Sequence, residues 1–235
     1  MSIYKRILLK LSGEALAGDK GVGFSAETIT TFAQEIIEAQ NNGTQIAIVL
    51  GGGNIFRGIK GTGLGIDRVK GDYMGMLATV INALAMESQI NSMGAKAKVL
   101  TSTFMEPYAE RYTRERALSY LNQGYIVIFA GGTGNPFFTT DSAAALRAVE
   151  ISAEILLKAT NVKGVYSDDP KKNPQATFYP EISFTQVIEQ QLRVMDLTAF
   201  TLCQENNMPI VVFNIFEKNN ILKILRGEKV GTLIH

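Results

Sequence analysis

The sequence predicts an α/β fold, a three-layer α/β/α sandwich around a mostly parallel central sheet. Three apolar runs have the length of strands, and each leads into a glycine-containing turn: Lys5–Lys10, Gln45–Leu50 and Tyr125–Ala130. Continuous apolar runs are typical of strands that are buried on both faces, as in a parallel sheet. Segments with helical spacing alternate with these runs, which is the pattern of α/β proteins.

The remaining elements can be placed in chain order. Ser25 is suited to cap a helix that runs to about Asn41 and stops at Asn42-Gly43. The other predicted elements are helices over Thr113–Gln123 and Asp141–Ala153 and strands over Ala97–Thr101, Glu154–Ala159 and Pro209–Asn214. Because no linker, low-complexity stretch or internal repeat interrupts them, we expect a single domain over residues 1–235.

The segment Asp67–Met93 predicts a helix that is too apolar for an ordinary surface position. One stripe consists of Met74, Leu77, Ile81 and Leu84, and the other faces carry Met76, Val80, Ala83 and Met86. A helix that is apolar all round must be buried. It can be a central core helix or a helix at a subunit interface, since a methionine-rich face also suits packing between chains.

Composition excludes several classes of function. The chain has 235 residues, with 23 Lys and Arg against 22 Asp and Glu, and this near balance argues against a nucleic-acid or membrane partner. The single cysteine, Cys203, and the single histidine, His235, exclude an internal disulfide, a zinc cluster and a histidine-based triad. No residue is singled out as a metal ligand. Met1–Lys10 lacks the apolar region of a signal peptide, so a cytoplasmic protein is expected.

Two common nucleotide-binding motifs are absent. Gly13 and Gly18 have the spacing of a Walker A loop, but Asp19 stands where that loop needs lysine. The Rossmann fingerprint fails after Gly51 and Gly132 because phenylalanine occupies the position of its third glycine. The sequence therefore favours neither the P-loop fold nor the Rossmann dinucleotide-binding fold.

Three glycine turns nevertheless predict phosphate binding. In a parallel sheet the turns that follow the strands meet at the carboxyl edge, where ligands bind. Glycines allow close approach of the backbone, and the N–H groups of helix starts favour anions. A single such turn is usually only a tight connection, whereas three turns at one edge favour a phosphate site.

Charged residues stand near these turns. Lys10 ends a predicted strand, Arg57 follows a triple glycine, and Lys158 interrupts an apolar run. Each could be a phosphate ligand, although Lys10 could reach solvent and Arg57 could lie on a helix surface. Asp141 could be a helix cap, could orient nearby lysines or a magnesium-bound water, or could do both. A phosphate acceptor, already anionic at neutral pH, would require charge neutralisation and alignment rather than a general base.

Specific motifs along the chain resemble those of the bacterial UMP kinases, which belong to the amino-acid kinase superfamily. The resemblance extends from about Tyr4 to Ile234 and is carried by KLSGE (10–14), GGGNIFRG (51–58), GDYMGMLATVINALAM (71–86), GTGNPFFTTDSAA (132–144), LKATNVKGVYSDDP (157–170) and VMDLTAFTLC (194–203). It implies the amino-acid kinase fold and transfer of the γ-phosphoryl group of ATP to UMP, with Mg²⁺, in de novo pyrimidine nucleotide synthesis leading to CTP.

The resemblance also implies site residues. Lys10 and Asp141 would be catalytic, with Asp141 organising the catalytic lysines. Residues implied at the ATP site are Lys10, Leu11, Ser12, Gly13, Gly53, Arg57, Thr160, Asn161, Tyr166 and Asp169. Residues implied at the UMP site are Gly52, Asp72, Thr133, Gly134, Asn135, Pro136, Phe137, Phe138, Thr139 and Thr140, with the two phenylalanines shaping the base pocket.

The family further implies a homohexamer built as a trimer of dimers, activated by GTP and inhibited by UTP. The segment that corresponds to GTP activation consists of Gly18, Asp19, Lys20, Gly21, Val22 and Gly23, although a surface turn would have the same composition. Two alternatives remain open. The chain could be a superfamily kinase that acts on an acylamino acid or carbamate, or a non-catalytic UMP- or UTP-binding regulator.

Overall fold

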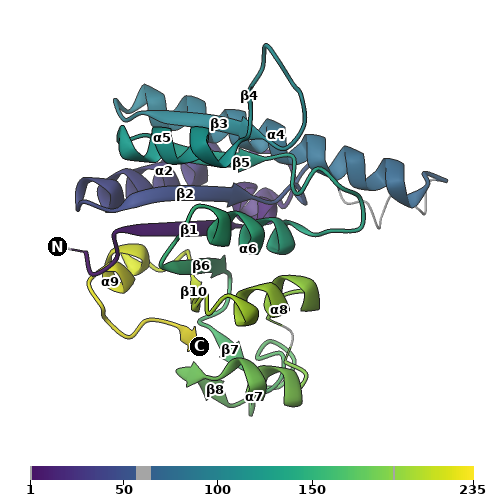
Figure 1. Ribbon diagram of the computed structural model, residues 1–235. Helices are drawn as coiled ribbons and strands as arrows, with labels where there is room; N and C mark the ends of the chain where they lie inside the picture. Colours follow the sequence, from purple (N-terminus) through teal and green to yellow (C-terminus); the bar gives the residue numbers. More distant parts are fainter. Residues whose placement is uncertain (1, 57–64, 193) are drawn as a thin grey trace.

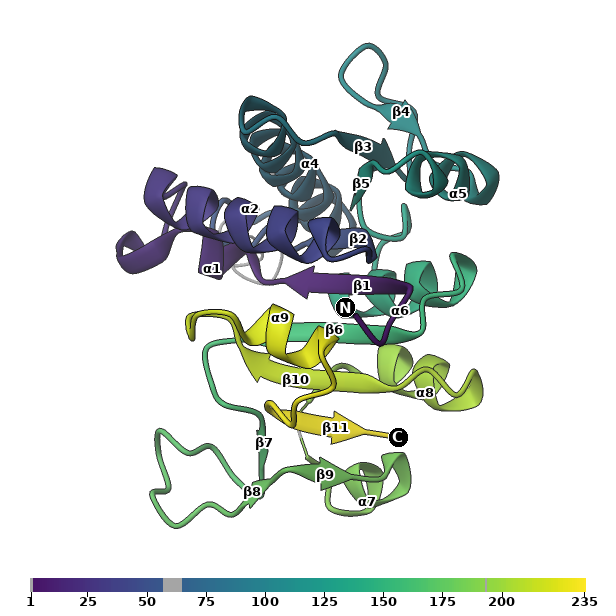
Figure 2. The same ribbon diagram turned by 90° about the vertical axis from the view of Figure 1, so that its left-hand side faces the viewer.

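The computed structural model describes residues 2–56, 65–192 and 194–235 and contains a nine-stranded sheet in the order β4-β3-β5-β2-β1-β6-β10-β11-β9. Neighbouring strands are parallel except for β10 and β11, so the predicted mostly parallel sheet is confirmed. Figure 2 shows this order from β4 at one end of the molecule to β9 at the other.

The elements have the following bounds. The strands of the large sheet are β1 (Arg6–Leu11), β2 (Gln45–Leu50), β3 (Ala97–Thr101), β4 (Glu110–Arg111), β5 (Ile126–Ala130), β6 (Ile155–Thr160), β9 (Glu181–Ile182), β10 (Ile210–Asn214) and β11 (Thr232–Ile234), and a separate hairpin joins β7 (Val165–Tyr166) to β8 (Phe178–Tyr179). The helices are α1 (Gly13–Leu16), α2 (Ala26–Asn41), α4 (Arg68–Ser92), α5 (Arg114–Asn122), α6 (Thr140–Glu150), α7 (Phe184–Glu189), α8 (Leu197–Glu205) and α9 (Asn220–Leu225), with a 3₁₀ turn over Gly18–Lys20.

Two apolar cores cover the two faces of the sheet. Alternate residues of a strand point to opposite faces, so Ile7 and Leu9 of β1 join the core beneath α1, α2, α4 and α9. Leu8 joins the second core, beneath α5, α6, α7 and α8. Figure 1 shows the resulting three layers. This is the predicted α/β/α arrangement, and its alternation places Lys10 on the α6 side.

The predicted helix over Asp67–Met93 has one buried face and one exposed apolar stripe. Asp67 caps α4 by accepting a hydrogen bond from the Lys70 N–H at 3.1 Å. Val80, Ala83 and Met86 are buried against the sheet. The opposite apolar stripe is exposed, and its residues are Met74, Leu77 and Ile81. The core interpretation therefore holds for one face, and a subunit interface on the other face stays a prediction.

The carboxyl ends of β1, β2, β5 and β6 meet at one edge of the sheet because these strands are parallel. The turns after them begin at Ser12, Gly51, Gly131 and Asn161. Glycine turns that lie far apart in the sequence are therefore neighbours in space. In the described part of the chain, no helix is both long and apolar enough to cross a membrane.

Candidate active site

Three charged side chains form a compact cluster at this edge. Lys10 of β1 and Lys158 of β6 are directly opposite each other in the strand register. The Lys10 Nζ lies 2.7 Å from Asp141 Oδ1, and the Lys158 Nζ donates a short hydrogen bond to Asp141 Oδ2. Asp141 enters from the first turn of α6, and all three side chains are largely buried.

The electrostatics of the cluster follow from two positive charges and one negative charge. Burial alone would raise the pKa of Asp141, but the ammonium groups of Lys10 and Lys158 outweigh it and hold that pKa below its ordinary value. Burial lowers the pKa of Lys158, and the positive charge of Lys10 acts in the same direction. The cluster carries a net charge of about +1 when all three groups are ionised, and it is suited to meet an anion.

A cavity of about 360 Å³ opens on one side of the cluster. Lys10, Ser12, Lys158, Thr160 and Asn161 line it. Four of these were implied at the ATP site, and Lys158 was noted for its charge. Ser12 also caps α1 by accepting a hydrogen bond from Ala15 N–H at 3.2 Å.

The other residues implied at the ATP site are placed less directly. The Leu11 side chain lies in the apolar core, so only its backbone can face a ligand. Tyr166 is in the β7–β8 hairpin, where its ring packs 5.3 Å from that of Phe178. Asp169 follows this hairpin strand, and neither Tyr166 nor Asp169 lines the cavity. Arg57 lies outside the described residues.

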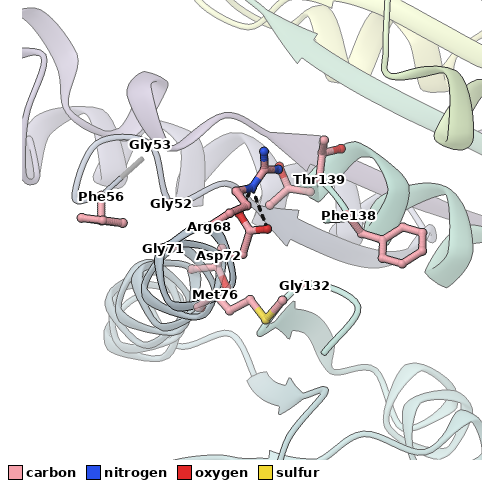
Figure 3. Close-up of a pocket in the computed structure, with 13 residues that line it drawn as sticks. Gly52, Gly53, Phe56, Arg68, Gly71, Asp72, Met76, Gly132, Phe138 and Thr139 are labelled. Carbon is pink, nitrogen blue, oxygen red and sulfur yellow. Dashed lines mark hydrogen bonds and ion pairs between the residues drawn. The ribbon is translucent and has the colours of Figure 1, made fainter. Parts of the chain in front are cut away.

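A second cavity, of about 470 Å³, opens beside α4 and is shown in Figure 3. Of the residues implied at the UMP site, it is lined by Gly52, Asp72, Phe138, Thr139 and Thr140. Gly53, which was implied at the ATP site, lines this cavity instead. Ten of the residues implied at the ATP and UMP sites therefore line one or the other of these two cavities.

Asp72 joins α4 to the 133–140 loop. Its carboxylate accepts hydrogen bonds from Arg68 Nε at 2.9 Å and from the Phe137 N–H at 2.8 Å. The dashed lines in Figure 3 mark the contact with Arg68. A carboxylate at the wall of a cavity can accept hydrogen bonds from hydroxyl groups of a ligand.

The two phenylalanines of the 133–140 loop differ in position. Phe138 lines the cavity and is 49% exposed. Phe137 has a positive φ of 72°, is 67% exposed and lies under the Arg68 guanidinium rather than in the cavity wall. Of the two rings that were expected to shape the base pocket, only that of Phe138 lines this cavity. The implied residues Thr133, Gly134, Asn135 and Pro136 form the outer part of the loop and do not line the cavity.

Close packing accounts for two glycines at the junction of the cavities. A Cβ on Gly13 would lie 2.7 Å from the Gly51 oxygen and 2.8 Å from the Gly53 nitrogen. A Cβ on Gly52 would lie 2.8 Å from the Ala78 Cβ of α4. The first glycine turn is therefore pressed against the second, and the second against α4.

The Gly18–Gly23 segment lies beside the first cavity. Gly18 lines that cavity, Gly18–Lys20 form the 3₁₀ turn, and the Gly23 N–H donates to the Asn54 oxygen at 3.0 Å. Asp19, Lys20, Gly21 and Val22 are exposed, which fits both an effector segment and a surface turn.

Several residues of the site carried no separate sequence signal. Asp196, the cap of α8, accepts hydrogen bonds from the hydroxyls of Thr139 and Ser142, and so ties together the starts of α6 and α8. Thr79 accepts from the Gly131 N–H at 2.8 Å and lines the second cavity. Asp196 lies in the VMDLTAFTLC motif, but the function of one carboxylate in a motif becomes clear only from its neighbours in space.

A family model, curated relatives and solved structures all match most or all of the chain. A family model described as the amino acid kinase family matches residues 5–214. A uridylate kinase from Parabacteroides distasonis is 52% identical over 235 residues and is covered completely, as is this chain. The crystal structure of UMP kinase from Bacillus anthracis has a TM-score of 0.96 at 42% identity, covering 99% of this chain and 96% of that chain. The UMP kinase from Ureaplasma parvum has a TM-score of 0.93 at 39% identity, with 98% of each chain covered.

Proposed function

The chain belongs to the amino acid kinase family, and we propose that it transfers the γ-phosphoryl group of ATP to UMP, producing UDP and ADP for pyrimidine nucleotide synthesis. One observation carries the proposal. The Lys10–Asp141–Lys158 cluster borders the first cavity through both lysines, and its carboxylate belongs to the residue that directly follows Thr140 of the second cavity. Such a position suits the point at which two sets of phosphates meet.

The chemistry requires alignment and charge more than proton transfer. The phosphate of a nucleoside monophosphate has a second pKa of about 6, so the attacking oxygen is already anionic at neutral pH. Phosphoryl transfer is catalysed mainly by positioning and by electrostatic stabilisation of the transferred group. In this proposal Lys10 and Lys158 stabilise the negative charge on the γ-phosphoryl group, and Asp141 holds both ammonium groups in place.

We assign the smaller cavity to ATP and the larger to UMP. Supporting the first assignment, Lys10, Ser12, Thr160 and Asn161 gather around one space. The backbone of Leu11 and Gly13 would complete the phosphate turn, and Tyr166 and Asp169 would close over the adenosine. Arg57 and Gly53 are proposed to assist at the phosphates.

For UMP, Asp72 would accept hydrogen bonds from the ribose hydroxyls, and Gly52 would offer its backbone to the phosphate. Phe138 provides an apolar wall for the base, and Thr139 and Thr140 border the same space. Thr133, Gly134, Asn135, Pro136 and Phe137 would form the rest of a loop that surrounds the nucleotide.

Mg²⁺ fits this site as a companion of ATP. In the described part of the chain, no three His, Cys, Asp or Glu side chains gather as a metal site. Both Asp141 oxygens already contact lysines. We therefore propose that the ion is held mainly by phosphate and water oxygens, as is common for Mg²⁺ in kinases. It would supply further neutralisation of the phosphate charge.

The assembly, regulation and location are proposed from the family. A homohexamer made of three dimers is supported by the exposed apolar stripe of α4, in which Leu77 is 51% and Ile81 47% exposed. Activation by GTP through Gly18–Gly23 and inhibition by UTP complete the proposal. We also propose a cytoplasmic location, which is consistent with nucleotide substrates.

A coupled ADP-release assay tests the function directly. The wild-type protein is expected to release ADP with UMP and much less with CMP, N-acetylglutamate or aspartate. Lys10→Ala should abolish turnover while the melting temperature changes little. Turnover with an acylamino acid but not with UMP would favour another kinase of the superfamily. UTP binding by calorimetry without any turnover would favour a regulator.

A further inference from the structure

Two asparagines form a buried amide pair behind the cavities. Asn54 follows the triple glycine, and Asn82 lies in the middle of α4. The Asn82 Nδ2 donates to Asn54 Oδ1 at 2.8 Å, and the Asn54 Nδ2 donates to Asn82 Oδ1 at 3.0 Å. Asn82 is fully buried and Asn54 nearly so. Both belong to motifs of the family resemblance, yet neither has a part in the function described so far.

All four donor hydrogens of the two side-chain amides are used, and the contacts join the Gly51–Asn54 turn, α4 and Gly23. The second hydrogen of the Asn82 amide is donated to the Gly51 oxygen at 2.6 Å. The second hydrogen of the Asn54 amide is donated to the Gly23 oxygen at 2.8 Å, and the Asn54 oxygen of the backbone accepts from the Gly23 N–H. Since each side-chain amide has two donor hydrogens, all four are engaged.

The same pair lies against the first glycine turn. A Cβ placed on Gly13 would lie 2.5 Å from Asn54 Oδ1, so the amide leaves room only for glycine there. Through these contacts the pair reaches both cavities: Gly51 leads into the Gly52–Gly53 wall of the larger cavity, and Gly13 follows Ser12 in the smaller one.

We propose that Asn54 and Asn82 are positioning residues, whose amide pair sets the glycine turns of both nucleotide cavities at once and couples them to the Gly18–Gly23 segment. This inference rests on the proposed function for its kinetic test. Apolar residues of the same size would fill the space but leave the Gly51 and Gly23 oxygens without these partners, and an unpaired carbonyl is costly at the buried Gly51.

The test compares Asn54→Ala, Asn82→Ala and the double variant with wild type in steady-state kinetics. Each single variant is expected to lower kcat/KM for ATP and for UMP by about tenfold, which corresponds to the loss of one or two buried hydrogen bonds. The double variant should be little worse than either single one, because each change breaks the same pair.

Asn122→Ala is the control for the loss of an exposed side-chain amide contact. Asn122 Oδ1 accepts from Gln45 Nε2 at 3.0 Å, so this variant breaks a side-chain amide pair at the opposite end of β2, away from the cavities. It should leave both kcat/KM values unchanged. Equal kinetic losses in the control and in the pair variants, or losses confined to one nucleotide, would overturn the proposal.

Asn54→Asp tests the coupling by measurements other than turnover. It keeps the volume and an acceptor for Asn82, but it removes the donors to the Gly23 oxygen and to Asn82 Oδ1 and adds a buried carboxylate. Hydrogen exchange of the peptide that contains Gly18–Gly23 should become faster, and calorimetric affinity for both ATP and UMP should fall. Unchanged exchange and affinity would contradict the inference. If the wild type binds both nucleotides but does not turn UMP over, the proposed function fails. The hydrogen exchange and the calorimetric affinities of Asn54→Asp then still test whether the amide pair positions the cavities.

Discussion

Lys10 and Lys158 stand directly opposite each other on the parallel strands β1 and β6, and their ammonium groups contact the same carboxylate of Asp141. Like charges that face each other across a sheet are unfavourable unless something offsets them. Asp141 offsets one of the two, so the other positive charge remains for a ligand. The arrangement therefore suits an anionic ligand.

Asp141→Asn should reduce kcat by about 100-fold or more, since removal of a preorganised electrostatic group commonly costs that much. The two lysines would lose their shared partner in a buried position. We therefore also expect a loss of about 3 kcal/mol in the free energy of unfolding. Steady-state kinetics and urea denaturation measure the two effects.

Glu27→Gln is the control for Asp141→Asn, because Glu27 is likewise an acidic residue in the first turn of a helix but is exposed. It should leave kcat unchanged and alter stability by less than about 1 kcal/mol. A similar kcat for Asp141→Asn and wild type would remove Asp141 from the mechanism.

The pH dependence of activity should reveal Lys158. Burial and the charge of Lys10 lower its pKa below the ordinary value of 10.5, and the reaction needs the protonated form. In the ligand-free enzyme, kcat/KM for ATP should therefore decline on the alkaline side before pH 10.5 is reached. A profile that stays flat to that pH, with the fold intact by circular dichroism, would show that Lys158 need not carry a proton.

Asp72→Asn should weaken UMP binding about tenfold and leave ATP binding unchanged. The variant removes the negative charge that accepts hydrogen bonds from Arg68 and from the Phe137 N–H, and a charged hydrogen bond contributes about 1.5–3 kcal/mol. Calorimetry with each nucleotide separates the effects. Equal losses for UMP and ATP would indicate a general defect of folding.

Glu35→Gln should stabilise the protein at neutral pH but not in acid. Burial raises the pKa of Glu35, while the hydrogen bond that its carboxylate accepts from the Asn219 N–H lowers that pKa in part. Neighbouring Glu38 raises the pKa further and Lys218 lowers it. Because the folded pKa lies above the unfolded one, the wild type is not penalised below pH 4.5 and loses stability as pH rises through the folded pKa.

Urea denaturation at pH 4.5 and pH 7.5 tests this, and the gain of Glu35→Gln over wild type should be larger at the higher pH. The exposed Glu27 of the same helix provides the control, since Glu27→Gln should show little difference between the two conditions. A gain that is equal at both pH values would contradict the raised pKa.

Much of the fold could be predicted because the central strands are continuous apolar runs. The predicted strands correspond to β1, β2, β3, β5, β6 and β10 within one or two residues, and Ser25 caps α2 as expected. The strands β4, β7, β8 and β9 have two residues each, and their pairing depends on neighbours that are distant in sequence. Short helices such as α7 and α9 likewise depend on packing rather than on periodicity.

The site could be predicted only in part for a similar reason. Charge in an apolar run singled out Lys158, and a glycine turn singled out Lys10, but the shared contact with Asp141 is a property of strand register. The Asn54–Asn82 pair gives no local pattern at all. Its significance depends on three segments that meet in space.

The most direct measurement is calorimetric binding of a bisubstrate analogue in which adenosine and uridine are joined by a chain of phosphates. If the two cavities hold two nucleotides with their phosphates meeting at Lys10, one analogue should bind per chain and exclude both ATP and UMP. Lys10→Ala should weaken it strongly. An analogue that competes with only one nucleotide, or that binds equally well to Lys10→Ala, would contradict the account.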